Sequence, residues 1–312
     1  MKKTAILLAI VLLALPASAA TVKNKTVPSS QAPAPQVIKD YQWDTVPRLK
    51  GRRMFIQSMS SYGNHCITAY GTKSPKAMGD IFDMRTGKIA GAGITYENAP
   101  WSRPHCNMAS FGKEHLGGNK LPVLYLSQWD RDKERGTLVY DIKMNGDGSA
   151  SAVQVQRIRA DVPDDILGST SVDWVVDTDA GNLYSFGYSM PGNNTWDYQS
   201  QYNTTKVCVF RLPKLSEGEE VVLTGKDLVD NYDIEAMVYR QDAAYHKGKI
   251  YIATGIHKRS CVYLKEFDLK KKCITRVFDL RTIVYKEPEG VFFHGNNLII
   301  NFGRDELYTI KL

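Results

Sequence analysis

Residues 287–312 read EPEGVFFHGNNLIINFGRDELYTIKL, and the architecture of the chain can be inferred from these residues. It contains three short apolar runs separated by Gly, Asn and Asp turns, which predict three antiparallel strands and no fourth. The stretch VIKDYQWDTV at residues 37–46 resembles ITRVFDLRTI at residues 274–283, an expected outer strand. The first residues of the domain can therefore supply the strand that the last residues lack. A series of sheets closed in this way forms a ring without open edges.

The rest of the chain divides into four more units of the same kind. Each begins with a short strand, turns at Gly or Asn, continues into an apolar strand and adds two further strands, the last in the third unit being EEVVLTGKDL at 219–228. The five units span residues 55–96, 104–160, 171–228, 240–283 and 287–312. We therefore predict an all-β fold, a five-bladed β-propeller with about 55 residues per blade, whose N-terminal strand completes the last blade. A β-sandwich, or a pair of them, would not explain the missing strand.

The N-terminal residues have the pattern of a secretory signal peptide. Lys2 and Lys3 precede an apolar run at residues 5–15 that is too short to span a bilayer, and small residues follow it. We predict a signal peptide over residues 1–20, a flexible Pro/Ser/Ala-rich linker over 21–36 and the propeller over 37–312. No later segment is long and apolar enough to span a membrane. The protein is therefore expected to be secreted or periplasmic.

Charge and cysteine content argue against several classes of function. Without Lys2 and Lys3 the 40 basic residues become 38, against 33 acidic ones, so the net charge is about +5. The tight basic run at residues 270–272 lies at an expected hairpin turn, and no nucleic-acid partner is expected. The five cysteines are odd in number and match no zinc spacing. Cys261 and Cys273 are expected at opposite ends of one hairpin, so no disulfide between them is predicted.

The start of each innermost strand carries polar residues that should face the central channel. Buried polar groups beside an apolar core need partners, which are each other, water or a ligand. We therefore predict a ligand site at one mouth of the channel. Its candidate residues are Gln57, His105, Asn107, Asp173, Gln241, Asp242 and Glu289. The alternative is a water-filled channel whose polar wall only satisfies itself.

The sharpest local signal is the sequence Glu287-Pro288-Glu289-Gly290. Gly290 allows a close backbone approach and Pro288 stiffens the chain, so Glu289 should be presented rigidly. Carboxylates from several blades could hold calcium, because hard cations need several oxygen ligands. Only three of the five blades offer such an acid. We therefore expect no cofactor and no metal, with calcium as the alternative.

A long insertion in the third unit is rich in aromatic and amide side chains. It reads SMPGNNTWDYQSQYNTT and occupies residues 189–205. This composition suits stacking on sugars or recognition of a partner. The alternative is a loop that packs its own aromatic rings over the edge of the blade.

Three strings of the repeat carry a resemblance to a known group of proteins. They are PHCNMASFG at residues 104–112, RQDAAYHKGKIYIATG at 240–255 and EPEGVFFHGNNLIINFG at 287–303. These strings resemble secreted bacterial propellers grouped with teichoic acid biosynthesis protein C and with phage tail receptor-binding propellers. The resemblance implies a propeller that binds a surface polymer or glycan, and it implies no known reaction. At the level of fold the chain is also similar to five-bladed glycosidases and calcium-dependent nucleotidases, and fold alone does not transfer chemistry.

The sequence favours a binding module over an enzyme. The module would be a monomer that recognises a carbohydrate, cell-envelope polymer or protein partner through the channel mouth. The alternative is a glycoside hydrolase, which needs two facing carboxylates about 5 Å or about 6.5–9.5 Å apart. Its catalytic candidates are Asp173, Asp242 and Glu289, but Gln57 and Ser58 stand where five-bladed glycosidases usually carry their first acid. A calcium-dependent phosphohydrolase is less favoured, because the expected ring has no basic residue to hold a polyphosphate.

Overall fold

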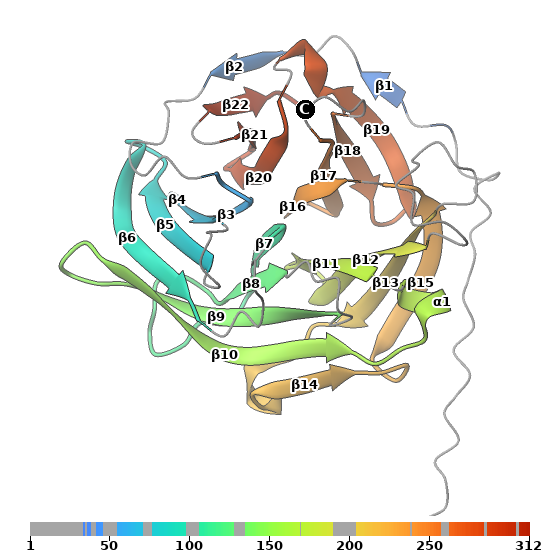
Figure 1. Ribbon diagram of the computed structural model, residues 1–312, viewed down its shortest axis with the longest axis horizontal. Helices are drawn as coiled ribbons and strands as arrows, with labels where there is room; N and C mark the ends of the chain where they lie inside the picture. The colour runs from blue at the N-terminus through green and yellow to red at the C-terminus, as the bar shows by residue number, and fades with distance from the viewer. Residues whose placement is uncertain are drawn as a thin grey trace, which may run out of the picture.

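The described part of the chain forms five twisted β-sheets arranged around a central axis, which confirms the predicted five-bladed β-propeller (Figure 1). The computed structural model describes residues 34, 36–38, 42–45, 55–70, 77–97, 106–127, 135–168, 170–189, 204–237, 239–256, 262–283, 286–303 and 306–312. Outside this set lie the predicted signal peptide, the predicted linker except Ala34 and Gln36, His105, Cys261 and residues 190–203 of the aromatic insertion.

Within each sheet, the strands follow one another outward from the axis (Figure 1). Blade 1 contains β3 (Ser58–Tyr62), β4 (His65–Ala69), β5 (Ala77–Asp83) and β6 (Lys88–Tyr96). Blade 2 contains β7 (Met108–Phe111), β8 (Leu124–Ser127), β9 (Gly136–Met144) and β10 (Ala150–Ala160). Blade 3 contains β11 (Thr170–Asp177), β12 (Asn182–Ser189), β13 (Thr204–Arg211) and β15 (Leu228–Glu235). Blade 4 contains β16 (Arg240–His246), β17 (Lys249–Thr254), β18 (Tyr263–Asp268) and β19 (Cys273–Asp279). Blade 5 contains β20 (Pro288–His294), β21 (Asn297–Phe302), β22 (Glu306–Ile310) and β2 (Trp43–Thr45).

The N-terminal segment closes the ring, but it does so with two strands instead of one. Strand β2 pairs antiparallel with β22, with Trp43 opposite Ile310 and Thr45 opposite Tyr308, as the sequence predicts. Strand β1 (Gln36–Ile38) instead runs parallel to β19 and adds a fifth strand to blade 4. The prediction of a single strand over residues 37–46 is therefore wrong in its first half. The first strand also begins one residue before the predicted domain boundary.

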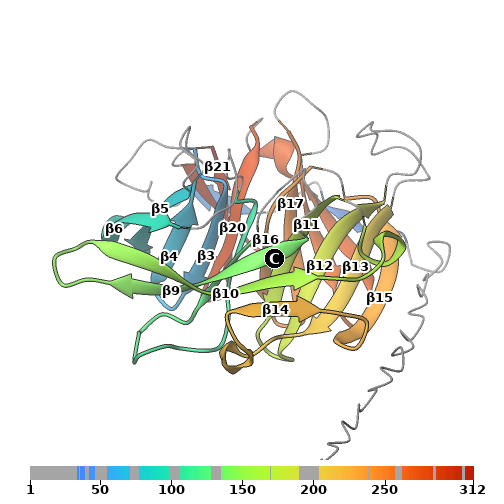
Figure 2. The ribbon, with the colours of Figure 1, turned by 60° about the horizontal axis from the view of Figure 1, so that its bottom comes forward.

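A second correction concerns blade 3. Residues 219–228 were expected as its outer strand, but β14 (Glu220–Leu223) pairs in parallel with β10 of blade 2. Strand β15, directly after this stretch, is the outer strand of blade 3. Figures 1 and 2 both show β14 lying beside β10 at the periphery. The alternation of Val221 and Leu223 identifies a strand, but alternation does not say which sheet it joins.

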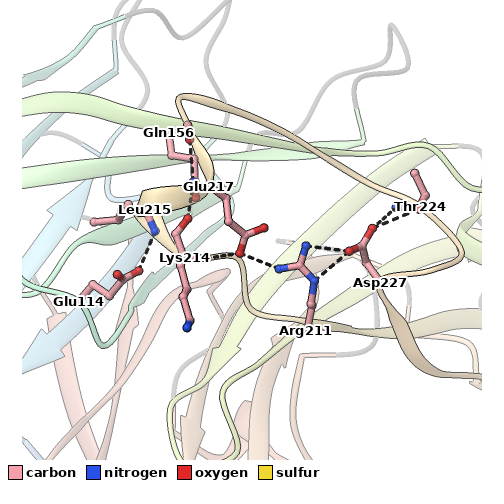
Figure 3. A network of polar contacts seen from close by, with 9 residues as sticks. Glu114, Gln156, Arg211, Lys214, Leu215, Glu217, Thr224 and Asp227 are labelled. Atoms are coloured by element: carbon pink, nitrogen blue, oxygen red, sulfur yellow. Dashed lines mark hydrogen bonds and ion pairs between the residues drawn. The ribbon is translucent and has the colours of Figure 1, made fainter.

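A network of polar contacts holds the chain where it crosses from blade 3 to blade 2 (Figure 3). Arg211, at the end of β13, contacts Glu217 at 2.7 Å and Asp227 at 2.8 Å. Gln156 of β10 donates to the carbonyl oxygens of Lys214 and Gly218, at 3.0 and 2.9 Å. These contacts anchor the short turn η1 (Leu215–Glu217) and position β14. Their role is structural.

The hydrophobic core lies between neighbouring blades. Tyr96 of blade 1 packs edge-on against Tyr140 of blade 2, with ring centroids 5.2 Å apart. Phe186 of blade 3 makes the same kind of contact with Phe267 of blade 4, at 5.8 Å. Aromatic pairs of this geometry fix how blades pack together. The inner strands, and therefore the side chains that face the axis, are held by this core.

The remaining fold predictions have mixed outcomes. The basic run at residues 270–272 forms the turn between β18 and β19, as predicted. Four cysteines are buried free thiols: Cys66, Cys106, Cys208 and Cys273. The proposed absence of a Cys261–Cys273 disulfide involves a residue outside the described set. In the described part of the chain, no helix is long and apolar enough to cross a membrane.

Candidate functional site

The carboxylate of Asp242 lies where the inner strands of four blades meet. This residue is fully buried, and its Oδ2 accepts the backbone N–H groups of Met59 at 2.9 Å and Val291 at 2.8 Å. Its Oδ1 accepts the N–H of Ala109 at 3.4 Å, and the N–H of Ala243 also contributes. Burial raises the pKa of Asp242, while these four donors act in the opposite direction. Asp242 therefore ties blade 4 to blades 1, 2 and 5, and it is a structural group.

Asp242 divides the channel into two ends, which we name by the direction of the inner strands. The upper mouth is the end at which β3, β7, β11, β16 and β20 begin. The lower mouth is the end at which these strands finish. The predicted site residues that the structure describes belong to the upper mouth or to the polar layer directly beneath it.

Backbone bulges direct two polar side chains toward the upper mouth. In β16 the pairing shifts between Arg240 and Asp242, and in β20 it shifts between Pro288 and Gly290. The extra residues are Gln241 and Glu289, each five positions before the residue pair that closes its hairpin. A bulge re-aims the side chain of its extra residue, and bulges are frequent beside binding sites. The equivalent position in blade 1, five residues before Tyr62, is Gln57.

These positions form a group that we call the acid–amide cluster, consisting of Gln57, Gln241, Glu287 and Glu289. Gln57 Nε2 donates to Glu289 Oε2 at 3.4 Å, and Gln241 Nε2 donates to Glu287 Oε1 at 2.8 Å. Gln241 also donates to the carbonyl of Gly255 at 2.9 Å. The cluster therefore spans blades 4, 5 and 1 and carries two carboxylates and two amides.

Glu289 is the least satisfied member of the cluster. Its side chain is buried, with 6% of the residue exposed, and its hydrogen bond to Gln57 is long. Burial raises the pKa of Glu289 well above its ordinary value, and the neighbouring charge of Glu287 raises it further. Gly290 permits this placement, because a Cβ there would lie 2.6 Å from Met59 Cγ. The predicted close approach at Gly290 is therefore confirmed.

A buried ion pair lies under the other side of the mouth. Arg240 Nε contacts Asp173 Oδ2 at 2.7 Å, and both side chains are almost fully buried. The guanidinium also donates to the carbonyls of Met237 at 3.1 Å and Phe186 at 2.8 Å, and it stacks on Tyr188 with Cζ 3.7 Å from the ring centroid. Burial raises the pKa of Asp173, and Arg240 opposes that shift. The ion pair joins blade 3 to blade 4.

The structure places the predicted site residues in three groups. Gln57, Gln241 and Glu289 come together at the upper mouth, whereas Asp242 and Asp173 are engaged by structural donors. Asn107 donates to the backbone carbonyl of Arg240 at 3.4 Å, which connects blade 2 to blade 4. His105 lies outside the described residues.

Two residues near the mouth were missed. Glu287 was visible in the Glu-Pro-Glu-Gly motif but not included in the site, although Gln241 contacts it. Arg240 directly precedes Gln241 in the sequence, and the expectation of a ring without basic residues is wrong. In the part of the chain that the structure describes, no group of three or more His, Cys, Asp or Glu residues could hold a metal ion.

Comparison with known proteins bears on the fold. No protein-family model matches the sequence, and no curated protein is significantly similar to it. A glutaminyl cyclase from Myxococcus xanthus superimposes with a TM-score of 0.51 at 11% identity, over 89% of this chain and 97% of the other. A tail fibre of Staphylococcus aureus phage P68 gives a TM-score of 0.48 at 11% identity, over 86% of this chain and 52% of that one. A chain of a nidogen/laminin complex gives 0.41 at 12% identity, over 80% and 72%.

The similarity is one of fold. At 11% identity the cyclase supports the propeller architecture and carries no residue roles to this chain. The resemblance to teichoic acid biosynthesis protein C is not among these findings and stays a prediction.

Proposed function

We propose that the protein is an exported binding propeller that recognises a carbohydrate of the cell envelope, carrying amino or hydroxyl groups, at the upper mouth. The supporting observation is Glu289, a buried carboxyl whose pKa is raised and whose contact among the described residues is one long amide hydrogen bond. Burying such a group without a strong partner costs free energy. A ligand that supplies donors there would recover this cost.

The polar groups of the acid–amide cluster determine which groups of a ligand they can bind. Carboxylates accept hydrogen bonds, and each amide offers both a donor and an acceptor. An ammonium group between Glu287 and Glu289 would form charge-assisted hydrogen bonds, and sugar hydroxyls can bond to either kind of group. Binding of an ammonium would also lower the pKa of Glu289, so affinity for an amino sugar should rise as the pH increases above 4.5, the ordinary pKa of a glutamate.

Glycoside hydrolysis remains the alternative, and the geometry supports it less. Two carboxylates must face each other across the scissile bond. Both oxygens of Asp242 accept backbone N–H groups, and Asp173 Oδ2 is paired with Arg240, so these two carboxylates are less suited to act as an acid or nucleophile. Glu287 and Glu289 come from one chain segment on one side of the mouth. A phosphohydrolase has the further difficulty that Arg240 is committed to Asp173.

The test is titration calorimetry with glucosamine oligomers and neutral glucose oligomers, comparing the wild type with Glu289→Gln. We expect Glu289→Gln to weaken binding of the glucosamine oligomer by about tenfold or more, because a charge-assisted hydrogen bond is lost. Glu220→Gln is the matched control, since it removes an exposed carboxylate on β14 and should leave affinity unchanged.

Two results would change this assignment. Unchanged affinity in Glu289→Gln would remove the acid–amide cluster as the binding site. Hydrolysis of the best-bound oligomer, abolished in Glu289→Gln but retained in Glu220→Gln, would establish the glycoside hydrolase instead.

A further inference from the structure

The lower mouth of the channel contains a hollow that the proposed function does not use. Its volume is about 470 Å³, within the range of about 300–1,000 Å³ that small-ligand sites occupy. All five blades contribute to its wall. Lining residues, one from each blade in chain order, are Tyr62, Ser110, Thr178, Tyr245 and Phe293. These residues follow the Asp242 layer along the inner strands, so the hollow is separated from the acid–amide cluster.

Small side chains on the inner strands create this space. Ala109, Ala243 and Ala244 form part of the wall together with Ser60 and Ser61. Where five strands meet at an axis, residues of this size leave room that larger side chains would fill. The small residues of the inner strands therefore account for part of the hollow.

Aromatic rings at the rim are held in place by their neighbours. The hydroxyl of Tyr245 donates to Asp179 at 2.7 Å and accepts the N–H of Gly248 at 3.0 Å. Phe293 is stacked against His246, with centroids 4.0 Å apart and planes at 8°. Tyr62 is 43% exposed and rests edge-on against another rim ring. Rings fixed in advance lose little entropy when a ligand binds.

Two serine hydroxyls beneath the rim have unused donor capacity. Ser60 Oγ accepts the N–H of Phe111 at 3.2 Å, and Ser110 Oγ accepts the N–H of Val176 at 3.1 Å. Each hydroxyl uses one lone pair in this way and keeps its proton. Among the described residues neither proton has an acceptor. A ligand oxygen in the hollow would provide one.

The charge of the hollow differs from that of the upper mouth. No Asp or Glu belongs to its wall among the described residues, and Lys113 lies exposed at the rim. Aromatic faces combined with hydroxyl donors match a ring that has C–H groups on one face and oxygen acceptors at its edge. From this combination we propose that the lower mouth is a second ligand site, which takes one neutral pyranose residue of a glycan.

Saturation-transfer NMR with methyl β-glucopyranoside, methyl β-galactopyranoside and methyl α-mannopyranoside tests this site. We expect the wild type to transfer saturation to the ring C–H protons of at least one of these sugars. Tyr62→Ala should weaken that binding by about fivefold, because a stacking face is lost, whereas Tyr62→Phe keeps the face and should change it little. Thr178→Trp should abolish it by filling the hollow.

Controls separate this site from the acid–amide cluster. Glu289→Gln should leave the methyl pyranoside signal unchanged, and loss of the signal in that variant would place the sugar at the upper mouth and overturn the proposal. Absence of transfer from all three sugars, or equal transfer in Tyr62→Ala and wild type, would also overturn it. Because Tyr62 is exposed, Tyr62→Ala stays informative if Thr178→Trp fails to fold by circular dichroism. Tighter binding of methyl glucuronoside that depends on Lys113 would contradict a neutral ligand.

Discussion

Asp242 and Glu289 are two buried carboxyl groups near the same axis, and their surroundings differ. The carboxylate of Asp242 accepts backbone N–H groups from several blades, whereas Glu289 has a long hydrogen bond from Gln57 and a second carboxyl beside it. Both lie at the start of an inner strand, and the sequence marks both as candidate site residues. Hydrogen-bond donors, more than burial, distinguish the group that joins the blades from the group that we propose to bind a ligand.

Removing the carboxylate of Asp242 should destabilise the fold more than any other single change described below. Asp242→Ala leaves backbone N–H groups of several blades buried without an acceptor, at about 1–3 kcal/mol for each group. We expect the free energy of unfolding to fall by about 4 kcal/mol or more, measured by urea denaturation with tryptophan fluorescence. A loss below about 1 kcal/mol would show that the ring does not depend on Asp242.

The next largest effect is expected from the ion pair beneath the mouth. Arg240→Met leaves Asp173 charged and buried without its cation, which should cost about 3–5 kcal/mol. The double variant Arg240→Met, Asp173→Leu should recover much of this loss, because no buried charge is left. Arg211→Met is the control, since its side chain is 46% exposed and its loss should cost about 1 kcal/mol. Thermal unfolding of the wild type and the three variants measures their relative stabilities. A double variant no more stable than Arg240→Met would refute the expected cost of the unpaired Asp173.

The pH dependence of stability should differ in sign between two buried carboxyl groups, those of Glu266 and Glu289. Burial alone would raise the pKa of Glu266, but hydrogen bonds from Arg276, Lys249 and Thr275 lower it to about 2. Glu266 therefore stabilises the fold above its ordinary pKa, and this stability is lost as pH falls from about 4.5 toward 2. Glu266→Gln should cost about 2 kcal/mol at pH 7, allowing for the exposure of its partners, and progressively less below pH 4.

Glu289 should show the opposite dependence. Its pKa is raised in the folded state, so its protonated form favours folding below about pH 4.5 and that contribution is lost as pH rises. Glu289→Gln should therefore be at least as stable as the wild type at pH 7, with the difference disappearing at low pH. Urea denaturation across pH 3–8 measures both variants. If the free energy of unfolding changed with pH in the same direction in Glu266→Gln and Glu289→Gln, the distinction between these two carboxyl groups would be contradicted.

The internal repeats of the sequence predict the ring of blades well. Each blade must bury its faces against two neighbours, so the same pattern of apolar strands recurs in every repeat. The five units and the pairing of β2 with β22 follow from it. Strands β1 and β14 could not be placed in the same way, because each joins the outer edge of a blade that is not its neighbour in the chain. A short alternating run specifies a strand but not its partner.

Sequence reasoning could locate equivalent positions on the inner strands but not the partners of the side chains there. The equivalent places of Gln57, Gln241 and Glu289 could be found by aligning the hairpin turns. The ion pair of Asp173 with Arg240 could not, because it depends on how two blades pack. The lower hollow is lined by residues from all five blades, and no single strand reveals it.

The two short N-terminal strands should also detach in a fixed order when the chain is pulled from its N-terminal side. Strand β1 precedes β2 in the chain and is bonded to blade 4, whereas β2 is bonded to blade 5. A pulling force applied from the N-terminal side must peel β1 from β19 before any load reaches the pairing that closes the circle. Strand β1 would therefore detach first, and the pairing of β2 with β22 that closes the ring would be loaded only afterwards.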